Sequence, residues 1–240
     1  MKAMIFAAGK GTRLKPLTNS MPKALVKVSG IPMLERVIQK LIQSGVDEII
    51  LNVHHFANHI IKFLKENDHF GIRIEISHEE NGLLDTGGGL KKASWFFKDN
   101  KPFILHNVDI LSDIDLAKMI EYHQHKNALA TLAVRERESS RYFLFNDQNR
   151  LCGWQNVKTG EIINHNPFHK IKKLAFSGIH IIHPEIFNYC PGLTKFSIVK
   201  TYLDLSQDHP IMAFPHNQGY WYDIGKPDNL KEANAFFNNS

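Results

Sequence analysis

Strand-like apolar runs alternate with helix-spaced apolar patterns along residues 1–134, and this alternation limits the fold more than any other feature. Parallel strands need long crossover connections, which helices supply, so the alternation predicts a mostly parallel sheet covered by helices on both faces. The expected strands are 2–6, 48–53, 72–77, 103–108 and 128–134, and the expected helices are 32–43, 58–66, 88–97 and 115–125.

The second half of the chain has a different pattern. Two β-rich segments within residues 142–154 flank the polar sequence NDQN, which is typical of a hairpin. The sequence then predicts a strand at 174–183, a helix at 197–206, a strand at 211–214 and a helix at 227–237. We therefore expect an α/β fold with a doubly wound, mostly parallel, Rossmann-like mixed sheet flanked by helices, and with an added β hairpin in the second half.

Composition and charge exclude several classes of protein. The net charge of +5 suits a small anionic substrate, but it is too small and too scattered to indicate nucleic acid. No apolar run approaches the roughly 18 residues of a membrane-spanning helix, so no membrane partner is expected. Cys152 and Cys190 form no CxxC pair, and a chain of 240 residues with a disulfide framework would normally use more cysteines. We therefore expect a cytoplasmic protein.

A glycine-rich loop, FAAGKGTRLKPLTNSMPKALV at residues 6–26, follows the first expected strand. It is not a dinucleotide fingerprint, because a leucine stands where the third glycine is needed, and it is not a Walker loop, because no glycine lies five residues after Gly9 or Gly11. These glycines let backbone N–H groups approach an anion, and Arg13 and Lys23 add positive charge. A tight turn with solvated lysines is the alternative that the loop alone leaves open.

Two aspartates are candidates for a metal site. Asp109 follows the expected strand 103–108, so it lies at the carboxyl end of a strand, where open α/β sheets bind ligands. Asp223 stands beside Gly225 at another β segment. Two carboxylates from separate strands would suit one Mg²⁺, with waters and phosphate oxygens as the other ligands. The alternatives are a turn residue at Asp109 and a helix-approach residue at Asp223.

Asp113 and Asp115 form a further acidic group in the sequence DILSDID. The spacing lacks the glycine and the final glutamate of an EF-hand, which excludes a calcium loop of that kind. The D-x-D spelling also occurs at strand ends in glycosyltransferases, but here it stands beyond the strand-end residue Asp109. We expect one of the two aspartates to cap the following helix, where a carboxylate accepts hydrogen bonds from free N–H groups.

A second glycine-rich segment, LLDTGGGLKK at residues 83–92, opens an expected helix. Its three glycines would let the backbone approach a flat base or a ribose. The alternative is a plain turn in which Asp85 or Thr86 caps the helix.

Histidines and aromatic residues are assigned to packing or to the surface. His55 and His59 are four residues apart, but HExxH is absent and no third metal ligand is evident. Trp95, Phe96 and Phe97 are expected to pack on a helix face.

The opening loop, with AAGKGTRLKPLT and PKALV, resembles the signature of the sugar-1-phosphate nucleotidylyltransferases. Further segments match that family's pattern in the same order: DTGGGL at 85–90, HNVDIL at 106–111, FSGIHII at 176–182 and WYDIGKPDNL at 221–230. The resemblance covers nearly the whole chain. It implies a GT-A-type fold in a single nucleotidyltransferase domain, 1–240, with a nucleotide-binding half at 1–135 and a sugar-phosphate-binding half at 136–240.

The resemblance also implies roles for individual residues. Arg13 would contact the β and γ phosphates of a nucleoside triphosphate, Lys23 would lie near the α-phosphorus, and Asp109 would be the third catalytic residue. Asp109 and Asp223 would bind Mg²⁺. The implied nucleotide-binding residues are Ala7, Ala8, Gly9, Gly11, Thr12, Arg13, Lys23, Asp85, Thr86, Gly87 and Gly88. The implied sugar-phosphate-binding residues are Asn107, Arg141, Phe176, Ser177 and Gly178, with a surface arginine as the alternative at Arg141.

Two departures from the family pattern bear on the substrate. DTGGG is closer to the ETGGG of N-acetylmuramate 1-phosphate uridylyltransferases than to the GTAGA of thymidylyl- and guanylyltransferases, which favours UTP. Lys226 stands in place of the threonine of the family's DIGTP motif. Lys170, Lys172 and Lys173 are expected to form a solvated cationic stretch.

The leading hypothesis is a Mg²⁺-dependent enzyme that joins a nucleoside triphosphate, UTP in the first place, to a sugar 1-phosphate such as N-acetylmuramate 1-phosphate. It would release pyrophosphate, and it could assemble as a homodimer. Alternatives on the same fold are CTP with phosphocholine and GTP with mannose or heptose 1-phosphate. A catalytically inactive regulatory protein that binds nucleotide sugars is the alternative of another class, although a pure binder would not need two metal carboxylates.

Overall fold

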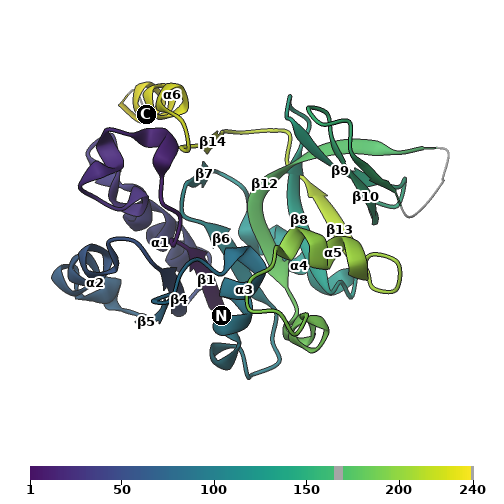
Figure 1. Ribbon diagram of the computed structural model, residues 1–240, viewed down its shortest axis with the longest axis horizontal. Coiled ribbons are helices and arrows are strands. Elements are labelled where there is room, and N and C mark those ends of the chain that lie inside the picture. Colours follow the sequence, from purple (N-terminus) through teal and green to yellow (C-terminus); the bar gives the residue numbers. More distant parts are fainter. Residues whose placement is uncertain (165–169, 239–240) are drawn as a thin grey trace. The chain divides into compact units, whose positions relative to one another are not determined.

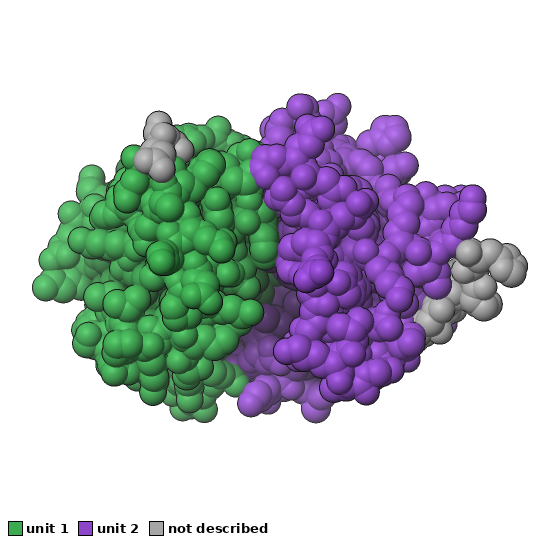
Figure 2. All heavy atoms as spheres, turned by 90° about the horizontal axis from the view of Figure 1, so that it is seen from above, with its two compact units in different colours: residues 1–83, 105–113, 220–240 green, residues 84–104, 114–219 purple. Residues whose placement is uncertain are grey.

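The computed structural model describes residues 1–164 and 170–238 and has a mixed α/β fold, with helices flanking a mostly parallel central sheet (Figure 1). The expected fold class is confirmed. The chain forms two compact units, which Figure 2 colours separately: unit 1 contains residues 1–83, 105–113 and 220–240, and unit 2 contains residues 84–104 and 114–219. The assignment of 1–240 to a single catalytic domain, with halves 1–135 and 136–240, stays a prediction.

Unit 1 is built on parallel strands. Strand β1 (Lys2–Phe6) pairs with β4 (Glu48–Val53), and β4 pairs with β5 (Arg73–His78). The register sets Phe6 opposite Asn52. Both β1 and β4 are short apolar runs with buried centres, as expected for strands that are covered on both faces.

Helices α1 (Met33–Gln43) and α2 (Ala57–Glu66) flank these strands (Figure 1). Five apolar side chains of α1 recur at helical spacing and are buried: Met33, Leu34, Val37, Ile38 and Leu41. The loop before α1 contains short elements, which are η1 (Thr12–Leu14), η2 (Leu17–Asn19), η3 (Lys23–Leu25), β2 (Lys27–Val28) and β3 (Ile31–Pro32). A further turn, η4 (Asp68–Gly71), precedes β5.

The carboxyl-terminal segment of the chain completes unit 1. Strand β14 (Trp221–Asp223) pairs antiparallel with β7 (Ile110–Ser112), with Asp223 opposite Ile110. Helix α6 (Pro227–Asn238) packs beside β14 and β2. Strand β6 (Phe103–Asn107) leads into β7 and has residues in both units. Strands β7 and β14, which are more than a hundred residues apart in sequence, therefore lie side by side.

Unit 2 contains the mixed β structure. Strand β8 (Ala130–Arg135) pairs in parallel with β13 (Ile211–Pro215) and antiparallel with β12 (Lys172–Ile182). The expected hairpin is formed by β9 (Arg141–Phe145) and β10 (Leu151–Asn156), and β11 (Ile162–Asn164) extends it. The helical elements of this unit are α3 (Asp85–Lys92), η5 (Ser94–Phe96), α4 (Leu116–His125), η6 (Pro184–Tyr189) and α5 (Ile198–Leu205).

The first helix of unit 2 differs from the expected range 88–97. Helix α3 starts at Asp85 and ends at Lys92, and a separate 3₁₀ turn, η5, follows. Glycine is a poor helix former, so the sequence favoured a later start. The N–H groups of Gly87 and Gly88 donate to the carbonyl of Phe196, and this contact holds the first turn.

Two expectations about local packing can be compared with the structure. Asp115 caps α4, because its side chain accepts a hydrogen bond from the Lys118 N–H at 3.0 Å, as expected for one of the two neighbouring aspartates. Phe96 and Phe97 are buried, as expected, but the expectation is wrong for Trp95, which is 45% exposed and meets Phe96 only edge-on. Within residues 1–164 and 170–238, no helix is long and apolar enough to cross a membrane.

Candidate functional site

The loop after β1 is anchored by a buried chain of polar groups. The Ala7 N–H donates to Asn52 Oδ1 at 2.8 Å, and Asn52 Nδ2 donates to Glu79 Oε1 at 2.7 Å. Ala7, Asn52 and Glu79 are all buried. Hydrogen bonds in a dry interior are strong, so this chain of polar groups fixes the point at which the loop leaves the sheet.

The sequence analysis did not identify Asn52 or Glu79. A usable signal was present, because Asn52 is a polar residue near the end of the otherwise apolar strand EIILNV. A buried polar side chain needs hydrogen-bond partners, and free N–H groups in the adjacent glycine-rich loop are natural ones.

Gly11 allows the loop to fold back onto Lys23. Its φ is +63°, and a Cβ at this position would lie 2.9 Å from Lys23 Cβ and 3.0 Å from Thr18 Cγ2. The Thr18 hydroxyl donates to the Gly11 carbonyl at 2.9 Å. The positive φ and the close approach both require glycine here, and together they bring η3, which starts at Lys23, against the loop.

Lys23 and Asp109 form an ion pair. Both side chains are largely buried, with 11% and 18% of their surfaces exposed. Asp109 is held close to the loop by the backbone, because the neighbouring Val108 N–H donates to the Phe6 carbonyl at 3.2 Å. A largely buried pair is screened by solvent much less than a surface pair, so each charge strongly affects the other.

Asp223 lies beside Asp109 through the pairing of β14 with β7. The Ile224 N–H donates to the Asp109 carbonyl at 2.8 Å. The Asp223 carboxylate accepts from the Gly225 N–H at 2.9 Å, and the Asp223 carbonyl accepts from Asn229 Nδ2 at 2.6 Å. Two carboxylates that are distant in sequence are therefore held at neighbouring strand ends.

Arg13 reaches the same place from the loop. A Cβ built on Gly225 would lie 2.6 Å from Arg13 Nη2 and 2.7 Å from Asp223 Oδ1. The guanidinium and the carboxylate thus converge on the space that the missing side chain of Gly225 leaves. Sequence analysis selected Arg13 and Asp223 separately, and the structure brings them together within unit 1.

The charge arrangement fits a triphosphate with a divalent cation. Two cations, Arg13 and Lys23, and two carboxylates, Asp109 and Asp223, converge near a glycine-rich loop. Carboxylate oxygens from two strands are the hard ligands that Mg²⁺ prefers, and it commonly uses one or two protein carboxylates with phosphate and water. No group of three or more histidine, cysteine, aspartate or glutamate side chains suited to a metal occurs in the described part of the chain, so phosphate and water would have to supply the remaining ligands.

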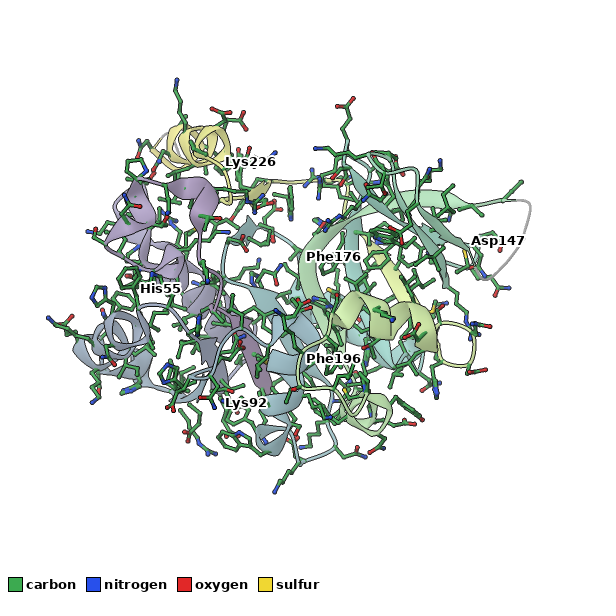
Figure 3. All side chains as sticks on the ribbon, viewed as in Figure 1. His55, Lys92, Asp147, Phe176, Phe196 and Lys226 are labelled. Carbon is green, nitrogen blue, oxygen red and sulfur yellow. The ribbon has the colours of Figure 1, made fainter. Side chains whose placement is uncertain are left out.

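The glycine-rich segment of α3 is packed against its own unit. The carbonyl of Phe196 accepts from the N–H groups of Gly87 and Gly88 at 2.9 and 3.2 Å. A Cβ on Gly87 would lie 2.3 Å from the Phe196 ring, and one on Gly88 would lie 2.2 Å from the Thr194 carbonyl oxygen. Phe196, which Figure 3 labels, therefore explains why glycine is needed at position 87, and the Thr194 carbonyl explains why it is needed at position 88.

The side chains of Asp85 and Thr86 are also engaged within unit 2. Asp85 Oδ1 accepts from the Thr86 N–H at 2.6 Å, and the Thr86 hydroxyl accepts from the Ile198 N–H at 3.0 Å, at the start of α5. A nucleotide-binding role for Asp85, Thr86, Gly87 and Gly88 stays a prediction.

The residues expected to bind the sugar phosphate are divided between the units. Asn107 ends β6 in unit 1. The others belong to unit 2, where Gly178 has a φ of +79° at a bulge in β12 between Phe176 and His180; Phe176 is labelled in Figure 3. Arg141 is exposed at the start of β9, in line with a surface arginine. A sugar-binding role for these residues stays a prediction.

Two side chains that the sequence analysis did not select support the bulge. Arg137 Nη2 donates to the Phe176 carbonyl at 3.0 Å, and the buried Ser177 hydroxyl bonds with His216 Nε2 at 2.7 Å. The four lysines considered from the sequence, Lys170, Lys172, Lys173 and Lys226, are all exposed; Lys226 is labelled in Figure 3.

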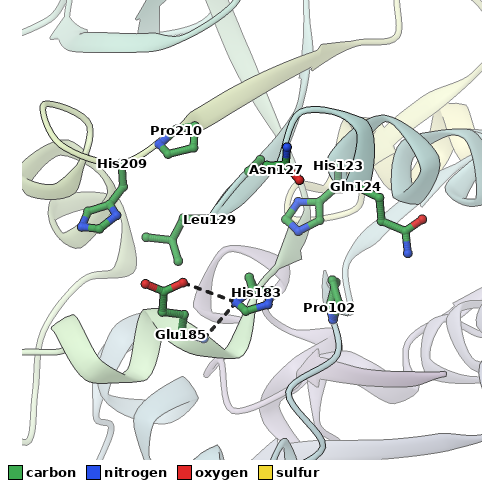
Figure 4. A pocket seen from close by; sticks show the side chains of 10 residues that line it. Pro102, His123, Gln124, Asn127, Leu129, His183, Glu185, His209 and Pro210 are labelled. Atoms are coloured by element: carbon green, nitrogen blue, oxygen red, sulfur yellow. Dashed lines mark hydrogen bonds and ion pairs between the residues drawn. The ribbon is translucent and has the colours of Figure 1, made fainter.

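Histidines gather at a pocket of unit 2 (Figure 4). The cavity is about 410 Å³, and His123, His183 and His209 line it together with Glu185. His123 is buried and bonds through Nδ1 with the Thr131 hydroxyl at 3.0 Å. Burial in the first place, and the neighbouring His183 in the second, lower the pKa of His123 to about 4. This pocket contains none of the predicted site residues.

His55 and His59 pack on Phe56, at ring-centroid distances of 4.0 and 5.1 Å. Both histidines are exposed, so their positions agree with the expectation of surface or packing residues.

Comparison with known proteins gives a consistent result. Residues 2–240 match the family described as Nucleotidyl transferase. The chain is 31% identical to the UTP–glucose-1-phosphate uridylyltransferase of Synechocystis sp., covering 95% of this chain and 61% of the relative. It is 30% identical to the mannose-1-phosphate guanyltransferase of Yarrowia lipolytica, covering 99% of this chain and 64% of the relative. The chain thus spans a little less than two thirds of the length of these curated relatives.

Among solved structures, HddC from Yersinia pseudotuberculosis complexed with GMP-PN is similar over nearly the full length of both chains. The coverage is 98% of this chain and 99% of HddC, with 25% sequence identity and a TM-score of 0.77.

Proposed function

Because the chain belongs to the nucleotidyl transferase family, we propose that it joins a nucleoside triphosphate to a sugar 1-phosphate, giving a nucleoside diphosphate sugar and pyrophosphate. The observation that carries the proposal is the convergence of Arg13, Lys23, Asp109 and Asp223 beside the glycine-rich loop in unit 1. A protein that only binds nucleotide sugars would not need both carboxylates at neighbouring strand ends.

In the proposed reaction, the phosphate oxygen of the sugar 1-phosphate attacks the α-phosphorus in line. The bond between the α-phosphorus and the bridging oxygen to the β-phosphate breaks, and pyrophosphate leaves. The attacking oxygen is already ionised at neutral pH, so no side chain has to remove a proton. Catalysis of this kind rests on positioning and on neutralising charge rather than on covalent chemistry of the protein.

The cationic side chains of unit 1 supply that neutralisation. Arg13 can hold two phosphate oxygens with its planar guanidinium and would bind the outer phosphates. Lys23 is paired with Asp109 in the structure, and it would contact the α-phosphate when the nucleotide binds. Asp109 and Asp223 would hold Mg²⁺, which supplies further positive charge at the phosphates.

The identity of the substrate pair is the finer part of the proposal. UTP with N-acetylmuramate 1-phosphate follows from the DTGGG sequence at residues 85–89. GTP with mannose or heptose 1-phosphate is the second candidate, and it has specific support, since a mannose-1-phosphate guanyltransferase is 30% identical and HddC was solved with GMP-PN. A cytoplasmic location and a homodimer remain part of the proposal.

The test is pyrophosphate release with Mg²⁺, using each of the four nucleoside triphosphates with a panel of sugar 1-phosphates. The panel includes N-acetylmuramate, glucose, mannose and heptose 1-phosphates. Selective release with UTP and N-acetylmuramate 1-phosphate supports the first pair, and release with GTP and a mannose or heptose 1-phosphate supports the second. Measurable nucleotide binding without release from any pair would refute the proposed activity and favour the regulatory protein.

A further inference from the structure

A second cavity, this one in unit 1, lies beside α1 and is not lined by the glycine-rich loop. It is about 190 Å³, which is the volume of some six waters at roughly 30 Å³ each. Its polar lining residues are Arg36, Gln39, Lys40, Gln43, Ser112 and Tyr220. None of them is among the predicted catalytic or substrate-binding residues.

One face of α1 supplies four of these residues. Arg36, Gln39, Lys40 and Gln43 follow the spacing i, i+3, i+4, i+7, which places them in a row along one side of a helix. The row combines two cations with two amides that donate hydrogen bonds. No carboxylate is among the residues that line the cavity.

Arg36 is a half-buried cation whose direct contacts are with neutral groups. Its Nε and Nη2 atoms donate to the Val28 carbonyl at 3.2 and 2.8 Å, and its guanidinium lies over the Phe237 ring, 4.4 Å from the centroid. Within residues 1–164 and 170–238 it forms no ion pair. Burial, in the first place, lowers the pKa of Arg36. The neighbouring Tyr220 and Glu35 raise this pKa and offset burial only in part. The structure therefore keeps an incompletely balanced positive charge partly away from water, and a bound anion would stabilise it.

Ser112 gives a second and independent sign of a ligand. The residue is 2% exposed, and its hydroxyl has no hydrogen-bond partner among the described residues. Buried hydroxyl groups are almost always paired, and an unpaired one costs about 1–3 kcal/mol. Ser112 lines the same cavity as the two cations.

From these observations we infer that the cavity binds a small phosphate-class dianion, held by Arg36, Lys40, Ser112 and Tyr220. A tetrahedral anion has enough acceptor oxygens for two cations and two hydroxyl groups at once. The phosphate is either inorganic phosphate or the phosphate group of a small metabolite whose remainder extends into solvent. The site does not depend on the proposed reaction.

The experiment is isothermal titration of inorganic phosphate into the protein without nucleotide, at constant ionic strength set with sodium chloride. The Arg13→Met background is used, so that phosphate binding at the glycine-rich loop is weakened. Lys40→Met in that background should lower phosphate affinity about tenfold or more, because it removes a charged hydrogen-bond donor. Lys62→Met is the matched control: Lys62 is 74% exposed on α2 of the same unit, and its replacement should leave the affinity unchanged.

Ser112→Ala separates ligand binding from folding. The substitution removes an unpaired hydroxyl, so it should leave the melting temperature unchanged or raise it, while phosphate affinity falls several-fold. Glucose 1-phosphate is titrated in parallel; equal binding of both probes indicates a phosphate group carried on a metabolite, and tighter binding of inorganic phosphate indicates the free ion. The site is refuted if the Arg13→Met protein binds no phosphate at about 10 mM, or if Lys40→Met and Ser112→Ala bind it like their parent.

Discussion

Replacing Gly225 by alanine should separate catalysis from stability. A Cβ at this position would lie 2.6 Å from Arg13 Nη2 and 2.7 Å from Asp223 Oδ1, whereas favourable contacts between heavy atoms occur at about 3.5–4.0 Å. Each group must therefore move by about 1 Å or turn away. Both are ends of side chains that can rotate, and the φ of Gly225 is not positive, so the backbone accommodates alanine.

A displacement of about 1 Å at a positioned group costs roughly 10²-fold in rate. We expect kcat/KM for pyrophosphate release to fall by about 10²-fold, which corresponds to about 2.7 kcal/mol of transition-state stabilisation. The melting temperature should change by only a few degrees, because no buried contact is removed.

A control variant and a double mutant test whether Gly225 acts through Arg13. Gly192 has no atom within 4 Å of a built Cβ and no positive φ, so Gly192→Ala should leave activity unchanged. If Gly225 acts through Arg13, Gly225→Ala combined with Arg13→Ala should be no slower than Arg13→Ala alone. Normal activity of Gly225→Ala, or multiplication of the two effects in the double mutant, would refute the reasoning.

Three further predictions follow from the site and its surroundings. Asp109→Asn should reduce turnover by about 10³-fold or more, because it removes a metal-binding charge without changing volume; circular dichroism should show an intact fold, and near-normal turnover would exclude a metal-binding role. Asn52→Leu should lower the free energy of unfolding by about 1–3 kcal/mol, as measured in urea, since it leaves the Ala7 N–H buried without a partner and removes a hydrogen bond to the buried Glu79 side chain; a loss below about 0.5 kcal/mol would contradict the anchoring role. The pKa of His123 falls from 6.5 to about 4 on folding, so the unfolded chain binds the proton first as the pH is lowered. The free energy of unfolding should therefore decrease as pH falls from 6.5 to 4, by at most about 3 kcal/mol from this residue. His123→Gln should flatten the plot of stability against pH over this range, and an unchanged pH dependence would show that another group is responsible.

The sequence predicted the long elements well because their apolar residues repeat with one clear period. Strands β1 and β4 were read from short apolar runs, and helix α1 from five buried side chains at helical spacing. Strand β7 was not predicted, and a β segment at Asp223 was expected without bounds or a partner. Three residues carry no measurable period, and the pairing of β7 with β14 depends on contacts across more than a hundred residues of chain.

The candidate site could be predicted residue by residue, but its assembly could not. Arg13, Lys23 and Asp109 stand at informative positions of the sequence, and the family resemblance gave them roles. Gly225 leaves room for the Arg13 guanidinium beside Asp223. This arrangement depends on distances in the folded chain, which the spacing of residues along the sequence does not give. The buried partner of Ala7, Asn52, was also missed: it lies within the expected strand 48–53, and its place in the strand does not show that its side chain accepts from the Ala7 N–H.

The pairing of β7 with β14 has a consequence for synthesis on the ribosome. Asp109 is synthesised more than a hundred residues before its neighbour Asp223, which is the last residue of β14. A nascent chain that lacks β14 holds only one of the two carboxylates. The growing polypeptide therefore gains the complete pair of acids only when β14 has left the exit tunnel, so a prematurely terminated fragment should be unable to carry out the chemistry.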